Sequence, residues 1–284
     1  MNIKSLYLAA LVTLFSLPVC IAQNKNLKEH LTFYASFDKT GEADFALGDP
    51  NIFTSPTRRE KEKAQVGLHD PNVVLTGDEG KFGGALEFKE KSRMLTFFKS
   101  KHNINYNETA WTGTISFWLK LDPEKDLEPG YCDPIQITDV NYNDASIWVD
   151  FTKDNPRQFR LGVLGDLSVW NPKNLPPDQN QDYIDRLIIM KQHPFSGTKW
   201  TQVTITYANL GQPDGEAKLY IDGELHGTEK NIDVPFTWEL EKSNIMLGLN
   251  YIGLMDELCV FNKTFDAKEV KSLYNLKKGI RSIL

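Results

Sequence analysis

Cysteine and histidine are scarce in this chain, which has three cysteines and five histidines among 284 residues. This scarcity excludes a cysteine-rich disulfide scaffold, and no cysteine–histidine spacing typical of a zinc site is present. An excess of positive charge is missing as well, because 32 basic residues are outnumbered by 38 acidic ones, which leaves a net charge of −6. Proteins that bind nucleic acids neutralise phosphates with basic residues, so we expect no nucleic-acid partner.

Long apolar segments are also few. Leu6–Leu17 is apolar, follows Lys4 and precedes the small-x-small sequence Cys20-Ile21-Ala22, but it is too short to span a bilayer. This pattern predicts a signal peptide over residues 1–22 and a single mature domain over 23–284. Lipidation at Cys20 is the weaker alternative, because the residues before it depart from the bacterial pattern. We therefore expect a secreted protein, or one of the periplasm or cell envelope, without a membrane span.

Recognisable catalytic motifs are absent from the sequence. It contains no Ser-His-Asp order, phosphate loop or dinucleotide-binding fingerprint. Glycosidases place two carboxylates across the scissile bond, and Asp150 is the one acid that lies clearly on a predicted polar strand face. Whether the protein is an enzyme stays open, and the missing motifs favour a protein without catalytic activity.

Strand patterns dominate what is present. Turn signals such as Asp222-Gly223, a two-residue hairpin signal, separate short alternating segments. They predict an all-β fold of two antiparallel sheets packed face to face, with long loops at 39–80 and 164–198 and a weak helix at 181–190. The predicted strands cover residues 31–37, 85–88, 94–98, 113–121, 135–138, 146–151, 158–164, 200–208, 217–221 and 244–249.

The end of the chain combines an acidic pair with a capped helix. Asp256 and Glu257 stand inside an apolar strand, where an unpartnered charge is costly. Asp266 and Glu269 then form a capping box that predicts a short C-terminal helix.

Several short stretches follow one another in an order and spacing typical of a known family: Phe37-Asp38, Gly80–Phe88, Gly113–Leu119, Lys199–Tyr207, Leu219–Gly223, Gly253–Phe261 and Phe265-Asp266. Together they resemble the laminin-G-like jelly-roll domain of the concanavalin A-like lectin/glucanase superfamily. Their order and spacing carry the resemblance over most of residues 31–276. It implies a curved two-sheet sandwich but no single function, because lectins, adhesion modules, glycosidases and lyases share that fold.

The resemblance also implies a structural calcium ion between the first and last strands. Asp38 and Asp256 match the two carboxylate positions, and a carbonyl near Gly83 or Gly84 is the third contributor. Calcium accepts such a mixture of carboxylate and carbonyl oxygens. In the alternative, Asp256 caps a turn or pairs with a lysine, and Asp38 merely ends a strand.

Two cysteines, Cys132 and Cys259, remain in the predicted mature chain. Export permits a disulfide between them. Two buried free thiols are the alternative, because a free cysteine packs as a small hydrophobic residue.

Strand alternation predicts one polar sheet face that carries aromatic rings. Ile147 and Val149 separate from Trp148 and Asp150, and the same alternation operates in the neighbouring strands. Aromatic rings and planar polar groups suit sugars, and the resemblance implies that a ligand lies on the concave sheet. The alternative is that loops cover the tryptophans and that Asp150 pairs with Arg160. The predicted ligand-binding residues are Trp118, Gln136, Trp148, Asp150, Arg160 and, from an adjacent insert, Trp170.

These observations favour a non-catalytic module that binds carbohydrate or cell-surface glycans, or that mediates adhesion. One alternative is a glycan-active hydrolase or lyase that uses Asp133, Asp139 or Asp150. The other is a purely structural protein of the cell envelope.

Overall fold

The computed structural model describes residues 27–284, so the predicted signal peptide over 1–22 lies outside the described residues. Its strands form two antiparallel sheets. One sheet contains β1 (Leu31–Ala35), β2 (Phe45–Ala46), β5 (Val73–Thr76), β6 (Ala85–Phe88), β8 (Trp111–Lys120), β13 (Thr201–Leu210), β14 (Glu216–Ile221), β15 (Glu224–Lys230) and β17 (Gly253–Phe261). The other contains β3 (Ile52–Ser55), β4 (Gln65–Val66), β7 (Leu95–Lys99), β9 (Cys132–Thr138), β10 (Ser146–Phe151), β11 (Phe159–Leu164), β12 (Leu187–Met190) and β16 (Asn244–Leu249).

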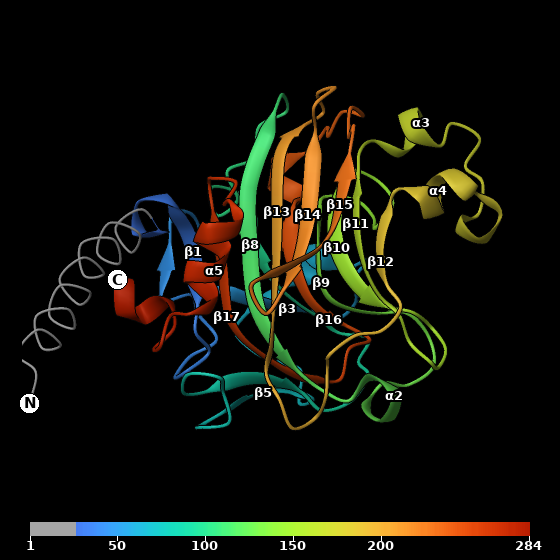
Figure 1. The fold of residues 1–284 in the computed structure, drawn as a ribbon. Coiled ribbons are helices and arrows are strands. Elements are labelled where there is room, and N and C mark those ends of the chain that lie inside the picture. Colours follow the sequence, from blue (N-terminus) through green and yellow to red (C-terminus); the bar gives the residue numbers. More distant parts are fainter. Residues whose placement is uncertain (1–26) are drawn as a thin grey trace, which may run out of the picture.

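The two sheets pack face to face, and the core lies between them (Figure 1). The nine-stranded sheet has the order β15-β14-β13-β8-β17-β1-β2, with β6 beside β17 and β5 beside β6. The eight-stranded sheet has the order β12-β11-β10-β9-β16-β7-β3-β4. Strands far apart in the sequence are neighbours in both sheets. The predicted two-sheet antiparallel sandwich is confirmed.

Alternate residues of each central strand fill the core. Phe117 of β8 and Val149 of β10 are fully buried between the sheets. Because side chains alternate across a strand, their neighbours Trp118 and Trp148 point to the two outer faces. The outer faces are therefore where a binding site can form.

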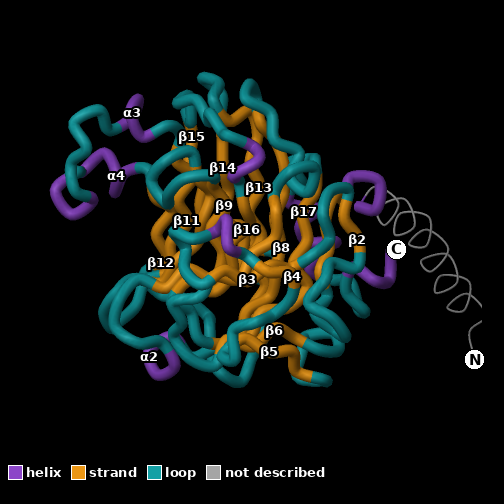
Figure 2. The backbone as a smooth tube through the Cα atoms, turned by 180° about the vertical axis from the view of Figure 1, so that it is seen from behind, coloured by secondary structure: helices purple, strands orange, loops and turns teal. Residues whose placement is uncertain are grey.

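Helices are short and lie outside the sandwich (Figure 2). None of those between residues 27 and 284 has the length and apolar character needed to cross a bilayer. The α-helices are α2 (Pro123–Asp126), α3 (Leu167–Trp170), α4 (Gln181–Asp185) and α5 (Ala267–Tyr274), and the 3-10 turns are η1 (Lys61–Lys63), η2 (Pro177–Gln179), η3 (Leu240–Lys242) and η4 (Ile280–Ile283).

The predicted C-terminal helix is confirmed as α5. The Asp266 side chain accepts hydrogen bonds from two backbone N–H groups, and Glu269 completes the capping box. The prediction of one helix over 181–190 is wrong in its second half. Leu187–Met190 forms the edge strand β12 and pairs with β11, because its isoleucines favour the extended backbone.

Helix α5 and the two ends of the described chain gather on the outer side of the nine-stranded sheet. Leu27, Ile280 and Ile283 belong to the same apolar cluster as Leu273 of α5. Lys28 Nζ donates a hydrogen bond to the carbonyl of Leu284 (2.5 Å). The first and last described residues are thus held together.

The predicted disulfide between Cys132 and Cys259 is wrong, since both thiols are free and buried. Cys132 belongs to β9 of one sheet and packs in the core between the sheets. Cys259 belongs to β17 of the other sheet and packs in the cluster under α5. The Cys132 side chain lies between the two sheets, whereas the Cys259 side chain lies on the outer side of the nine-stranded sheet. The sheet therefore separates the two sulfur atoms, and they cannot reach the short separation that a disulfide requires.

Candidate functional site

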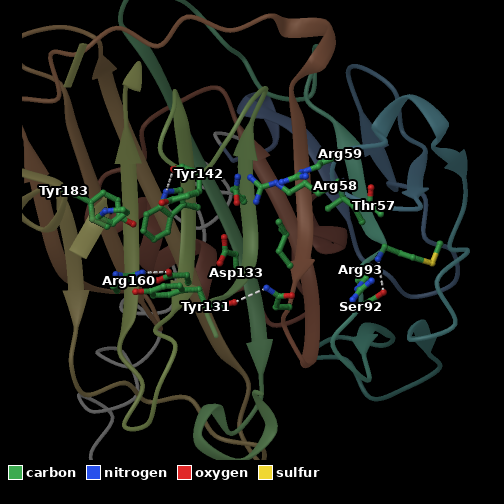
Figure 3. Close-up of a pocket in the computed structure, with 18 residues that line it drawn as sticks. Thr57, Arg58, Arg59, Ser92, Arg93, Tyr131, Asp133, Tyr142, Arg160 and Tyr183 are labelled. Carbon is green, nitrogen blue, oxygen red and sulfur yellow. Dashed lines mark hydrogen bonds and ion pairs between the residues drawn. The ribbon is translucent and has the colours of Figure 1, made fainter. Parts of the chain in front are cut away.

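A pocket of about 750 Å³ lies on the outer face of the eight-stranded sheet. Arginines and tyrosines dominate its lining, and Figure 3 shows Asp133 between a group of tyrosines and a group of arginines. Its lining residues are Thr57, Arg58, Arg59, Ser92, Arg93, Met94, Leu95, Tyr131, Asp133, Gln136, Tyr142, Trp148, Asp150, Arg160, Pro177, Tyr183, Leu249 and Asn250.

A buried ion pair forms part of the pocket wall. Asp150 of β10 and Arg160 of β11 are direct cross-strand partners. The Arg160 guanidinium donates two hydrogen bonds to the Asp150 carboxylate, from Nε to Oδ1 (2.8 Å) and from Nη2 to Oδ2 (2.5 Å). The side chains are only 8% and 6% exposed, so water screens the pair little. Burial raises the pKa of Asp150, and the charge and hydrogen bonds of Arg160 oppose that rise.

Trp148 lines the pocket but offers almost no free ring surface. It is 1% exposed, and its Nε1 donates to the carbonyl of Tyr142 (2.6 Å). The indole lies across Gly162, where a Cβ atom would stand 2.2 Å from Trp148 Cζ2. Glycine is therefore required there, and the ring is a fixed wall of the pocket with little room to stack on a ligand.

Tyr131 supplies the exposed aromatic surface that Trp148 lacks. It is 48% exposed, and the Arg160 guanidinium carbon lies 4.9 Å from the centroid of its ring. Tyr131 is not among the ligand-binding residues predicted from the sequence, although it lies in the turn-rich insert Pro129–Pro134. An exposed ring beside a fixed guanidinium is a suitable platform for a sugar ring.

Gln136 of β9 connects the two sides of the pocket. With its amide nitrogen turned toward Asp133 Oδ2 (3.1 Å), its oxygen accepts hydrogen bonds from Tyr142 N (3.1 Å) and Arg58 Nη2 (2.6 Å). Burial and the nearby charge of Asp150 raise the pKa of Asp133 well above its ordinary range. The acid in the centre of the pocket therefore binds its proton more tightly than an exposed aspartate does.

Trp118 and Trp170 lie outside this pocket lining. Trp118 belongs to β8 of the nine-stranded sheet and stacks on Tyr274 at 5.6 Å, so the predicted face shared with Trp148 does not exist. Alternation shows which side of its strand a residue occupies, but it does not show which sheet contains the strand. Trp170 is 7% exposed and packs behind Tyr183, at 6.1 Å between ring centroids.

The acidic pair of the closing strand is held by hydrogen bonds. Asp256 Oδ2 accepts from Lys81 N (2.6 Å) and Phe82 N (3.1 Å). A β-bulge follows Asp256, and Glu257 has a φ of 54° there. As a result, the Glu257 side chain lies on the same outer side of the sheet as that of Asp256. Its carboxylate accepts from Tyr34 Oη (2.5 Å) and Ile280 N (2.8 Å). Burial raises the pKa of Asp256 to about 8 and that of Glu257 to about 7.

The residues predicted to bind calcium do not fit that ion as they are arranged. Asp38 Oδ1 accepts from Gly84 N (2.8 Å), and its Oδ2 is paired with the Arg281 guanidinium. Asp256 is engaged by N–H donors, whereas calcium requires six to eight oxygen ligands. Gly83, which has a φ of 112°, lies so close to Asp38 that a Cβ atom would stand 2.1 Å from Oδ1. Between residues 27 and 284, no group of three or more His, Cys, Asp or Glu side chains is arranged to hold a metal ion.

Calcium is accordingly expected to leave the melting temperature of the protein unchanged. Arg281 already places a positive charge at Asp38, so a divalent ion would have to displace it. Thermal melts in calcium and in EDTA test this, with Arg281→Ala as the variant that frees the carboxylate. A rise of several degrees in calcium for the unmodified protein would show that the ion binds in spite of these contacts and would support the calcium prediction.

Comparisons with known proteins agree with the architecture. A family model described as the concanavalin A-like lectin/glucanases superfamily matches residues 98–271. No curated protein matches the chain.

Solved structures resemble the fold at low sequence identity. Domain 4 of AbnA, an extracellular arabinanase of Geobacillus stearothermophilus solved with arabinotriose, has a TM-score of 0.56 at 15% identity, over 87% of this chain and 98% of that one. The binding domain of botulinum neurotoxin DC, solved with SialylT, has a TM-score of 0.56 at 16% identity, over 90% and 52%. Trypanosoma rangeli sialidase has a TM-score of 0.54 at 13% identity, over 89% and 33%.

Proposed function

Because the chain belongs to the concanavalin A-like lectin/glucanases superfamily, we propose that it is a non-catalytic glycan-binding protein that holds an oligosaccharide in the pocket on the eight-stranded sheet. The exposed ring of Tyr131 beside the Arg160 guanidinium is the observation that carries this proposal. We place the binding outside the cell or at the cell envelope, in line with the predicted signal peptide. Adhesion to a glycan-bearing surface is the role that follows.

The composition of the pocket supports a sugar ligand. A pyranose or furanose ring has apolar C–H faces that pack on aromatic rings, and hydroxyl groups that need fixed donors and acceptors. Tyr131 and the half-buried Tyr142 supply ring surface, while the half-buried Asn250 supplies an amide. The volume of about 750 Å³ falls within the range of small-molecule sites.

The extent of the pocket favours an oligosaccharide over a single sugar. Its lining extends from β11 across β10, β9, β16 and β7 to the segment after β3. These elements span five strand spacings, or roughly 24 Å at about 4.8 Å each. The arabinotriose bound to the similarly folded domain 4 of AbnA also supports an oligosaccharide.

Tyr131→Ala is expected to weaken glycan binding at least about tenfold, which corresponds to about 1.4 kcal/mol. The variant removes the exposed ring and leaves the buried core intact, so its melting temperature should stay unchanged. A glycan array identifies a ligand for the unmodified protein, and calorimetry then compares the variants. Leu225→Ala, which removes an exposed apolar side chain from the other sheet, is the control. Failure of the unmodified protein to bind any glycan, or equal affinity of Tyr131→Ala, would refute the proposal.

Glycan hydrolysis is a second candidate because Asp133 has a raised pKa, as a general acid requires. Asp150, the other pocket acid, is held at both oxygens by Arg160, so no free carboxylate partner for Asp133 lines the pocket. This arrangement is why binding is the primary proposal. Product analysis of the same oligosaccharide mixtures separates the two, since cleavage that Asp133→Asn abolishes would establish the hydrolase.

A further inference from the structure

The pocket carries an excess of positive charge in a protein whose net charge is −6. Four arginines line it, namely Arg58, Arg59, Arg93 and Arg160, against the two acids Asp133 and Asp150. Arg160 and Asp150 neutralise each other as an ion pair. Three arginines then face a single acid in the centre of the pocket.

Arg58 is a half-buried cation whose hydrogen-bond partners are neutral. Its Nη2 donates to the amide oxygen of Asn141 at 3.1 Å and to that of Gln136 at 2.6 Å. Burial lowers the pKa of Arg58, and the charge of Asp133 opposes this. A buried charge is stabilised by an opposite charge nearby. A negatively charged ligand would therefore stabilise the Arg58 guanidinium.

Arg59 and Arg93 border the same end of the pocket and are exposed (Figure 3). Within residues 27–284, neither guanidinium takes part in an ion pair or a side-chain hydrogen bond. Ser92 and Thr57 lie beside them in the pocket lining and add hydroxyl groups. The planar guanidinium fork matches carboxylate and sulfate groups, which it can bind through two parallel hydrogen bonds.

We propose that the pocket selects anionic glycans, with one sugar ring on Tyr131 and a carboxylate or sulfate group of a neighbouring sugar on Arg58, Arg59 and Arg93. The inference rests on the proposed glycan-binding function and adds the ligand class. A neutral oligosaccharide would leave the arginine end without its complementary charge. The shared chemistry is a planar or tetrahedral oxyanion on a sugar, and the experiment distinguishes the two sources.

Three oligosaccharide probes of matched length test the selectivity of the full protein by calorimetry. One bears carboxylates (oligogalacturonate), one bears sulfates (a chondroitin sulfate fragment) and one is neutral (an arabino-oligosaccharide). At least one anionic probe is expected to bind about tenfold more tightly than the neutral one. Its affinity should fall as salt rises from about 50 to about 500 mM, because screening weakens exposed charge pairs. The anionic probe that binds more tightly identifies the recognised group as a carboxylate or a sulfate.

The double variant Arg59→Gln/Arg93→Gln is expected to lower the affinity for the anionic probe roughly tenfold or more and to flatten its salt dependence. Both side chains are exposed, so the fold should be unaffected. Lys277→Gln/Lys278→Gln removes the same charge from exposed positions after α5 and should leave binding unchanged.

The outcomes separate this inference from the proposed function. Binding of the neutral probe that depends on Tyr131, with no preference for either anionic probe, overturns the inference and leaves the glycan-binding proposal standing. An anionic probe whose affinity is insensitive to the arginine double variant also overturns the inference. Absence of binding to any glycan overturns both.

Discussion

Replacing Arg160 with alanine is expected to lower the free energy of unfolding by about 3–5 kcal/mol, because it leaves the Asp150 carboxylate buried without its partner. Both side chains are less than one-tenth exposed, and the two hydrogen bonds between them would be lost together. Urea denaturation monitored by tryptophan fluorescence measures the loss. The variant should also bind glycan poorly, since the guanidinium beside the Tyr131 ring is gone.

A matched double variant separates fold stability from binding at this pair. Asp150→Leu/Arg160→Met removes both charges, and such exchanges of a buried pair for apolar side chains are often neutral or stabilising. We therefore expect it to recover most of the stability lost in Arg160→Ala without recovering glycan binding. A cost below about 1 kcal/mol for Arg160→Ala would match an exposed salt bridge instead and would contradict the burial of this pair.

Stability is expected to fall by several kcal/mol as pH rises from about 4.5 to 8, because of Asp256 and Glu257. Their pKa values in the folded protein are raised to about 8 and about 7, whereas those of unfolded carboxyls lie near 4. An acid whose pKa is higher in the folded state binds its proton more tightly there. Its contribution is present below the unfolded pKa and is lost as pH rises through the folded pKa. Urea denaturation at pH 5 and pH 8.5 measures the difference.

Glu257→Gln should flatten this pH dependence and should be more stable than the unmodified protein at pH 8.5, by about 1–3 kcal/mol. The amide oxygen can accept from Ile280 N, and the amide nitrogen can donate to Tyr34 Oη, so both hydrogen-bond positions stay occupied. Glu79→Gln removes one exposed acid from the neighbouring loop and serves as the control. Identical pH profiles for Glu257→Gln and the unmodified protein would show that this carboxyl does not titrate with a raised pKa.

Local patterns predicted the fold well because strand alternation and turn residues are properties of neighbouring positions. The alternation pattern correctly predicted that the side chains of Trp148 and Asp150 point away from the core. The alternative ion pair between Asp150 and Arg160 could also be anticipated, since a hairpin makes them cross-strand neighbours. The same local information placed Trp118 on the wrong face, because the assignment of strands to sheets depends on pairings between distant segments.

The arginine side of the pocket could not be predicted from the sequence. Arg58 and Arg59 lie in a charged segment that reads as solvent-exposed loop, and Arg93 precedes a strand some thirty residues later. They come together only because β3 and β7 pair in the eight-stranded sheet. The calcium prediction depended on two acids at the ends of the domain, and their actual partners, Arg281 and the N–H groups of Lys81 and Phe82, carry no local signature.

The hydrogen bond between Lys28 and Leu284 keeps the two ends of the described chain together, which determines how the protein can be immobilised. Both ends of the described chain emerge on the side of the nine-stranded sheet, while the pocket opens on the other sheet. A tag or linker at either end would therefore orient an immobilised molecule with its pocket toward the solution. Several copies displayed in this way on one particle would all present their pockets outward, so that a multivalent glycan could engage more than one of them at a time.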